Sequence, residues 1–266
     1  SEIRRFVDDI VFRQILKSNR IRVDAVSEDY AFRRAIDEEQ PTSGGAQADL
    51  TIRVVTPYHP HAEDTNVVLH QSAGKKELLL VLEPDDLFLR DLRLYFQTDK
   101  YARQHLGHDT GSQSHRILTE KQHQNLERRD AIIKKLVEMV GQSEVYVMDT
   151  LVDKLPSDPA TRITQAFQKL VSRAYPRLQS LKVHYTEQSL HKIMFPDDGH
   201  ALYGGDAAPM DEAQKELWAA IQRRHAQSER TTLSTVQTDF AGGQYGWYTM
   251  AILCVLAQLY MRGAIE

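Results

Sequence analysis

The residues closest to a nucleotide-hydrolysis element are the apolar run from Leu78 to Leu82 and the acid that follows it, Glu83. An apolar strand that ends in a carboxylate has the form of a Walker B element, which holds Mg²⁺. A working site also needs the loop G-x-x-x-x-G-K-[ST], whose backbone N–H groups bind phosphates, and the sequence contains no match to it. The nearest segment, residues 74–76, lacks the first glycine and the hydroxyl residue. We therefore interpret residues 78–83 as a buried strand followed by an acidic helix start.

Histidine is the next residue type that could do chemistry, and it gathers at two places: His59 with His61, and the group His105, His108, His115 and His123. Histidine metal sites usually add cysteine or use an H-E-x-x-H arrangement, and neither accompanies these residues. Surface or capping histidines are the favoured interpretation. No G-x-S-x-G segment supports a nucleophilic serine, and no E-x-K tripeptide on the predicted sheet supports a nuclease centre. The sequence therefore predicts no catalytic residue, no metal site and no cofactor site in this chain.

Nucleic-acid binding has a stronger local case, because one predicted long helix carries six basic residues: Arg116, Lys121, Arg128, Arg129, Lys134 and Lys135. Acids at Glu120, Glu127 and Asp130 lie on the same helix, so its charge is only modestly basic. Exposed helices are often this highly charged for solubility alone, which makes a solvated face the favoured interpretation. The six basic residues remain our candidate contacts for nucleic acid or for a partner protein.

The composition describes a chain that can fold around a sizeable core in a reducing compartment. It has 266 residues, of which 41% are hydrophobic, a net charge of -4 and a single cysteine, Cys254. This length suggests one large domain or two to three small ones, and the charge gives no global reason to bind polyanions. One cysteine excludes an intrachain disulfide framework. The longest apolar run, residues 248–261, is too short to span a bilayer, so we expect a soluble, cytoplasmic protein without membrane contact.

The first 40 residues predict two helices with a short strand between them. Apolar residues from Ile3 to Val11 recur at the spacing of one helix face. Residues 21–23 suggest a short strand. Ser27 is suited to cap a second helix, whose apolar residues lie between Ala31 and Ile36.

A sheet is predicted to begin near residue 49, where the apolar spacing changes from a helical repeat to the two-residue repeat of a strand. Residues 50–55 form the first such strand, and residues 67–70 and 78–82 are predicted as two more. Residues 72–75 could connect the last two as a hairpin. The run at 78–82 is apolar enough to lie centrally in the sheet.

Two long helices follow in the sequence. Pro84-Asp85-Asp86 is suited to a helix start and leads into apolar residues up to residue 96. A polar, glycine-containing hinge at 106–112 then precedes the longest predicted helix, residues 114–141. The first two-thirds of this helix carry few apolar residues, which is typical of a helix that bridges between domains. Residues 145–148 could form a short strand after it.

The last third of the chain is predicted to be mainly helical. Asp158-Pro159 begins a helix that ends near Tyr175, and three more helices are expected at 211–227, 232–240 and 247–261. Three helices before an incipient strand resemble a truncated winged-helix module. The third helix is almost wholly apolar, whereas a base-reading helix needs exposed Arg, Lys, Asn or Gln, so we expect it to be core.

These elements predict an α+β fold: a small mixed sheet with helices, a long bridging helix and a helical, winged-helix-like C-terminal unit. The expected division is an α+β domain at 1–112, the bridging helix at 113–141, a helical or mixed unit at 142–208 and the winged-helix-like unit at 209–266.

Four segments carry a resemblance to a known family: residues 77–104 (ELLLVLEPDDLFLRDLRLYFQTDKYARQ), residues 116–147 from RILTEK to SEVYV, residues 157–178 (SDPATRITQAFQKLVSRAYPRL) and residues 244–266 (QYGWYTMAILCVLAQLYMRGAIE). Together they resemble the region downstream of the ATPase core in the large P-loop proteins of BREX phage-defence systems, the BrxC/PglY-like family. They cover about two-thirds of the chain and contain no catalytic signature.

The resemblance implies a non-catalytic scaffolding or coupling segment of a longer defence ATPase. ATP and Mg²⁺ are then expected at the parent's ATPase core and not in this segment, and other BREX proteins, a second copy of the chain or DNA are the expected partners. An independent nucleic-acid-binding module that uses the basic helix is the alternative. Whether Glu83 approaches a nucleotide in the parent stays open.

Overall fold

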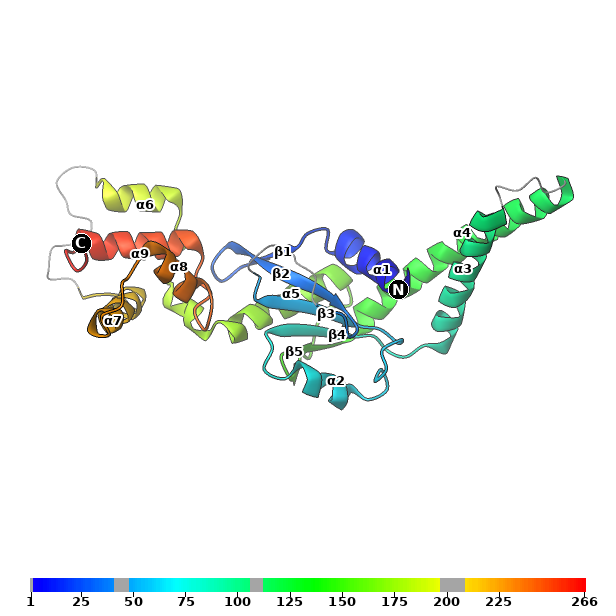
Figure 1. The fold of residues 1–266 in the computed structure, drawn as a ribbon, viewed down its shortest axis with the longest axis horizontal. Helices are drawn as coiled ribbons and strands as arrows, with labels where there is room; N and C mark the ends of the chain where they lie inside the picture. Colours follow the sequence, from blue (N-terminus) through cyan, green and yellow to red (C-terminus); the bar gives the residue numbers. More distant parts are fainter. Residues whose placement is uncertain (1, 41–47, 106–111, 197–208) are drawn as a thin grey trace. The chain divides into compact units, whose positions relative to one another are not determined.

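The computed structural model describes residues 2–40, 48–105, 112–196 and 209–266, with the backbone alone at 112–115. The hinge predicted at 106–112 and His108 therefore lie outside the described residues, apart from the backbone of Ser112. The chain forms two compact units, drawn in Figure 1. The first unit joins residues 1–21 and 30–170, and the second joins residues 22–29 and 171–266.

A mixed sheet is the centre of the first unit, as the sequence predicted, and it has six strands. Its strands follow the chain order β1-β2-β3-β4-β5-β6. β2 pairs in parallel with β3 and β3 with β4, whereas β4 pairs antiparallel with β5 and β5 with β6. The central position expected for residues 78–82 is confirmed, because β4 lies between β3 and β5. The strands are β1 (Arg20–Val23), β2 (Glu28–Ile36), β3 (Leu50–Val55), β4 (Glu77–Val81), β5 (Glu144–Val147) and β6 (Thr150–Leu151).

The two faces of the sheet differ in character. On one face Phe32, Ile52 and Leu78 are fully buried, and the Phe32 ring lies 5.7 Å from the ring of Phe167 in α5 (Pro159–Ala174). The other face is apolar only where α2 (Thr65–Ser72) covers it. Beyond α2 this face carries Arg33, Thr51, Arg53 and Glu77 at neighbouring positions of β2, β3 and β4.

Two of the predicted elements are wrong. Residues 28–36 form β2 and not a helix, because parallel pairing with β3 buries Phe32, Ala35 and Ile36, whose spacing fits either structure. Ser27 caps no helix and has a φ of 54° before β2. Residues 67–70 belong to α2 and not to a strand, so the expected hairpin connection at 72–75 instead joins α2 to β4.

The N-terminal helix forms as predicted, as α1 (Glu2–Asp8) followed by a π-helical turn at Asp9–Ile15. The two long helices also form, as α3 (Asp86–His105) and α4 (Ser112–Gln142). Together α3 and α4 are an excursion between two adjacent strands, since β5 returns to pair with β4. The residues that precede α4 in the sequence and those that follow it, up to residue 170, therefore belong to one compact unit. The division into four parts that the sequence analysis gave stays a prediction.

The second unit is helical around α9 (Thr249–Met261), against which α6 (Glu187–Met194), α7 (Glu212–Ala226) and α8 (Leu233–Ala241) pack. The three predicted helices at 211–261 are thus confirmed, whereas α6 and the 3-10 turn at Pro176–Ser180 were not predicted. Gly246 has a φ of 60°, and a Cβ there would lie 2.3 Å from the Tyr175 ring, so this position requires glycine. None of the described helices is long and apolar enough to cross a membrane.

Candidate interaction surfaces

α3 and α4 lie side by side as an antiparallel hairpin with one fixed register (Figure 1). At its base the Asp85 carboxylate lies 3.0 Å from the Lys135 ammonium. Ten residues further along each helix, the Asn125 Nδ2 donates to the Tyr95 carbonyl oxygen at 3.1 Å. Because the two contacts are ten residues apart on both helices, α3 and α4 pair in the manner of an antiparallel coiled coil. Consistent with this, buried residues recur every seven positions on α4, at Leu118, Asn125, Ile132 and Met139.

Three of the six candidate basic residues lie along the edge of this buried seam, seven residues apart, and each contacts the hairpin itself. The Lys121 Nζ donates to Gln124 Oε1 at 3.2 Å, and the Arg128 Nη1 donates to Asn125 Oδ1 at 2.9 Å. Lys135 forms the ion pair at the base. Lys135 therefore helps to hold the hairpin together, and Arg128 does so through Asn125, whereas the Lys121 contact lies within α4.

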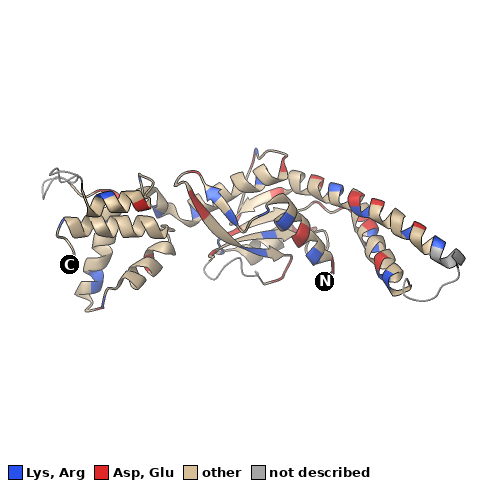
Figure 2. Cartoon of the chain, turned by 90° about the horizontal axis from the view of Figure 1, so that it is seen from above, with Lys and Arg blue, Asp and Glu red and all other residues tan. Residues whose placement is uncertain are grey.

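The other three candidates point in different directions. At roughly 100° per residue, Arg116 and Lys134 lie on the outward side of α4, and Arg129 lies on the opposite edge of the seam from Arg128. The outward side also carries Glu120, Glu127, Asp130 and Glu138. Figure 2 shows this mixture as basic and acidic residues interleaved along both helices. The structure thus does not gather the six basic residues into one patch.

An apolar groove near the distal end of the hairpin is a feature that the sequence analysis missed. Tyr101 of α3 and Ile117 of α4 are each 56% exposed, and with Ala102 and Leu118 they line a hollow of about 590 Å³. The polar residues of its lining are Gln97, Thr98, His105 and Lys121. A signal was present in the sequence, because exposed apolar residues recur every seven positions on α3, at Leu87, Leu94 and Tyr101.

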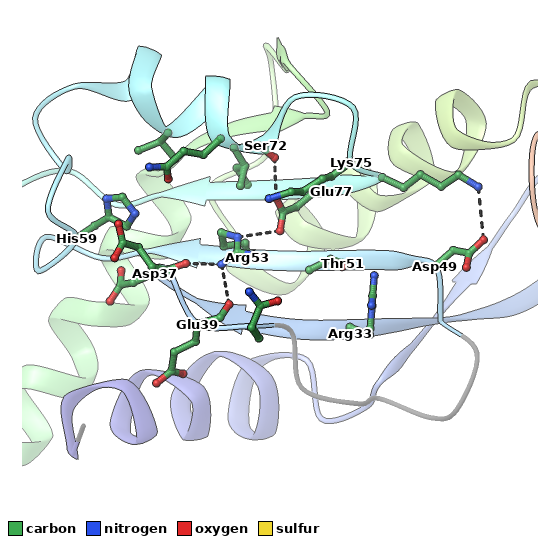
Figure 3. Close-up of a pocket in the computed structure, with 16 residues that line it drawn as sticks. Arg33, Asp37, Glu39, Asp49, Thr51, Arg53, His59, Ser72, Lys75 and Glu77 are labelled. Atoms are coloured by element: carbon green, nitrogen blue, oxygen red, sulfur yellow. Dashed lines mark hydrogen bonds and ion pairs between the residues drawn. The ribbon is translucent and has the colours of Figure 1, made fainter.

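A polar pocket of about 670 Å³ lies on the face of the sheet that α2 covers only in part (Figure 3). At its floor the Arg53 Nε lies 2.8 Å from Glu77 Oε1, and Ser72 donates to Glu77 Oε2 at 2.6 Å. Arg53 also donates to the backbone oxygens of Asp37 and Glu39. Glu77 is only 1% exposed, and both of its carboxylate oxygens accept a hydrogen bond. The buried charges of the pocket floor are therefore satisfied within the protein.

Asp37 and His59, at the end of the same pocket, are also engaged. The Thr56 backbone N–H and hydroxyl both donate to the Asp37 carboxylate, at 2.8 and 3.1 Å. Burial raises the pKa of Asp37 despite these bonds, and burial lowers the pKa of His59 despite the nearby carboxylate. The His61 backbone N–H donates to His59 Nδ1 at 3.1 Å. Buried, bonded groups of this kind are typical of a structural network that ties strand ends together.

Glu83, the acid of the Walker B-like segment, follows β4 and is exposed. The sequence contains no phosphate-binding loop to accompany it. Asp85, two residues later, accepts from the Phe88 N–H at 2.9 Å and so caps α3. Across the described parts of the chain, no group of three His, Cys, Asp or Glu side chains is placed to hold a metal ion.

In the second unit, α9 lies in the core, as its composition predicted. Seven of its thirteen residues are buried: Ala251, Ile252, Cys254, Val255, Ala257, Gln258 and Leu259. Gln258 is paired internally, since the Gln214 Nε2 donates to its Oε1 at 3.0 Å. This helix therefore presents few polar side chains that could contact base edges.

Comparison with known families assigns both units. Residues 1–170 match the family model described as "BREX ATP-binding protein BrxC 4th domain with six-stranded beta sheet". Residues 177–266 match the model described as "BREX ATP-binding protein BrxC winged helix-turn-helix domain". The limits of the two matches agree with the division between the units near residue 170. No solved structure matches the chain.

Proposed function

The chain belongs to the BrxC family of BREX phage-defence ATP-binding proteins, and we propose that it is a non-catalytic segment that couples the ATP-binding part of its parent to partner proteins. The family resemblance found in the sequence is thereby confirmed. The two matched domains, the fourth domain and the winged helix-turn-helix domain, contain no phosphate-binding loop. A role in binding other proteins of the system is the function that their surfaces support best.

The observation that carries this proposal is the hairpin of α3 and α4. It is inserted between two hydrogen-bonded neighbours, β4 and β5, which a short turn could have joined. Its distal half leaves large apolar side chains exposed, although exposed apolar surface has a cost in water. The distal half of this insertion is explained by a binding role, since it lies beyond Leu136 and Val140, through which α4 contributes to the core.

The hairpin register provides a clean deletion to test the proposal. Because Tyr95 faces Asn125, residues 97–123 can be removed from the full-length parent and replaced by a short Gly-Ser turn, which keeps Phe96 and its contact with Phe6. The base of the hairpin is kept, with the buried residues Phe88 and Leu92 of α3 and Ile132 and Leu136 of α4. We expect the shortened parent to fold and to lose co-purification with the other BREX proteins and phage restriction. Unchanged assembly together with unchanged restriction would reject the coupling role.

Nucleic-acid binding through the basic residues of α4 is the second candidate function. It is favoured by Arg116, Arg129 and Lys134, which are exposed and form no ion pair among the described residues. It predicts binding to duplex DNA with a steep salt dependence that is lost on charge reversal of Arg128 and Arg129. Arg128→Ala is a needed companion variant, because Arg128 also holds Asn125 in the seam.

A further inference from the structure

We infer that the distal groove of the hairpin, formed by Tyr101, Ala102, Ile117 and Leu118, is the docking site for an acid-flanked amphipathic helix of a partner protein. This inference rests on the proposed coupling function and names the surface and the partner chemistry through which coupling occurs. It uses two of the six basic residues, Arg116 and Lys121, and none of the buried charges of the polar pocket.

The shape of the groove matches a helix. Tyr101 and Ile117 stand on neighbouring antiparallel helices, so their side chains form the two walls of a channel that runs along the hairpin. The Tyr101 ring is held by stacking against His105 at a centroid distance of 4.0 Å. A third helix laid in this channel would insert its apolar side chains between the two walls, as in a three-helix coiled coil. Leu94, seven residues before Tyr101, would continue the contact toward the base.

The charges around the groove select an acidic partner. Lys121 lines the groove itself, and Arg116 lies beside Ile117 in the adjoining hollow. Lys100 adjoins Tyr101, and among the described residues neither Lys100 nor Arg116 has an ion-pair partner. Of the nearby acids, Asp99 pairs with Arg103 at 2.9 Å, and Glu120, which accepts from Gln124 at 3.0 Å, is outnumbered by Arg116 and Lys121 in the adjoining hollow. Carboxylates flanking the apolar face of the partner helix would complement these cations.

The first experiment measures the affinity of the full-length parent for each of the other BREX proteins, purified one at a time. Ile117→Asp and Tyr101→Glu should each raise the Kd of one partner about tenfold or more, because they place a charge inside an apolar contact. Leu126→Asp is the matched control. Leu126 is 58% exposed on the same helix, but it is nine residues from Ile117 and so on the opposite side. It should leave the Kd unchanged.

The second experiment identifies what the groove contacts. A photo-crosslinking amino acid at Ile117, in the full-length parent co-expressed with the BREX proteins, should crosslink to a segment of one partner that is apolar on one face and rich in Asp and Glu. Replacing both Lys121 and Arg116 by Glu should raise the Kd of that partner and reduce the salt dependence of this Kd. Crosslinks confined to nucleic acid, or to a second copy of the chain, would overturn the inference, as would equal effects of the Ile117 and Leu126 variants.

The outcomes separate this inference from the proposed function. If the hairpin deletion abolishes partner binding while Tyr101→Glu and Ile117→Asp preserve it, the coupling role stands and the groove is not the docking site. If the deletion also leaves partner binding intact, both proposals fail.

Discussion

The polar pocket and the distal hairpin both belong to the first unit and are both rich in charged residues, yet they use charge in opposite ways. At the floor of the pocket the two buried charges meet each other, with Arg53 Nε 2.8 Å from Glu77 Oε1, whereas the buried Nε of Arg33 in the same lining has no hydrogen-bond partner among the described residues. At the distal hairpin, apolar side chains and cations face solvent together. The paired charges of the pocket floor stabilise the fold, whereas the exposed side chains of the distal hairpin are available to bind a partner. A high density of charge therefore says little about function until the partners of the charges are known.

The base of the hairpin resembles the pocket more than it resembles the distal end. Asp85 and Lys135 pair there, and Phe6 of α1 packs against Tyr95 and Phe96 with ring centroids 6.0 Å apart. The change from paired to unpaired side chains thus occurs along a single pair of helices. Variants in the pocket, at the base and at the distal end should differ accordingly.

The largest expected effect is on stability, at Glu77. Glu77→Leu leaves the buried Arg53 guanidinium without its carboxylate, and breaking one partner of a buried pair costs about 3–5 kcal/mol. Urea unfolding followed by circular dichroism should show this loss. Both tryptophans, Trp218 and Trp247, lie in the second unit. The urea concentration at the midpoint of the tryptophan fluorescence transition should therefore be unchanged.

A double variant sharpens this result. Glu77→Leu with Arg53→Met removes both charges, so it should be less destabilised than Glu77→Leu alone. If the double variant is instead at least as unstable as the sum of the two single variants, the pocket charges do not act as a coupled pair.

A smaller effect is expected at the base of the hairpin. Asp85→Ala removes the N-cap of α3 and should cost about 1 kcal/mol, whereas Asp85→Asn keeps a capping oxygen and should cost less. The hydrogen bond from the Phe88 N–H, and then Lys135, hold the pKa of Asp85 below its ordinary value. Its charged form therefore stabilises the fold above about pH 4, and this contribution is lost as the pH falls through the lowered pKa. Urea unfolding of the Ala and Asn variants at two pH values measures both effects, and equal losses for the two variants would contradict the capping role.

The smallest expected effect is at Asp37, where Asn can keep the bond from the Thr56 N–H and accepts the positive φ of 51°. Burial raises the pKa of Asp37, so the folded chain holds this proton more tightly than the unfolded chain. The contribution of Asp37 to stability is then most favourable near and below its ordinary pKa of 3.8 and declines as the pH rises through the raised value. Relative to the unchanged chain, Asp37→Asn should gain stability as the pH rises from the ordinary pKa of 3.8 through the raised value. A constant difference across this range would show that Asp37 does not titrate as proposed.

Much of the fold was predictable because periodicity reports burial directly. The long helices, β3, β4, α5 and the helices α7, α8 and α9 of the second unit each carry an apolar pattern with clear end signals, such as Asp85 before α3 and Asp158 before α5. β2 and α2 were predicted wrongly because their apolar residues lie in short runs that fit both a helix and a strand. Only the parallel pairing of β2 with β3, in which Phe32 lies opposite Leu50, decides β2, and these two residues are not close in the sequence.

The candidate site was harder to predict than the fold. The six basic residues of α4 were identified by residue type, but their directions around the helix depend on which side packs against α3. That side is set by Leu118, Asn125 and Ile132, which are too widely spaced to form an obvious stripe. The distal groove was missed for a related reason: Tyr101 and Ile117 are far apart in sequence and meet only through the hairpin register.

The most direct test is the affinity of the full-length parent for its BREX partner, measured side by side for Ile117→Asp and Glu77→Leu at a temperature where both variants are folded. We expect Ile117→Asp to raise the Kd for the partner without lowering the free energy of unfolding. We expect Glu77→Leu to leave that Kd unchanged although it lowers the free energy of unfolding. Retained affinity in Ile117→Asp, or an equal loss of affinity in both folded variants, would contradict these expectations.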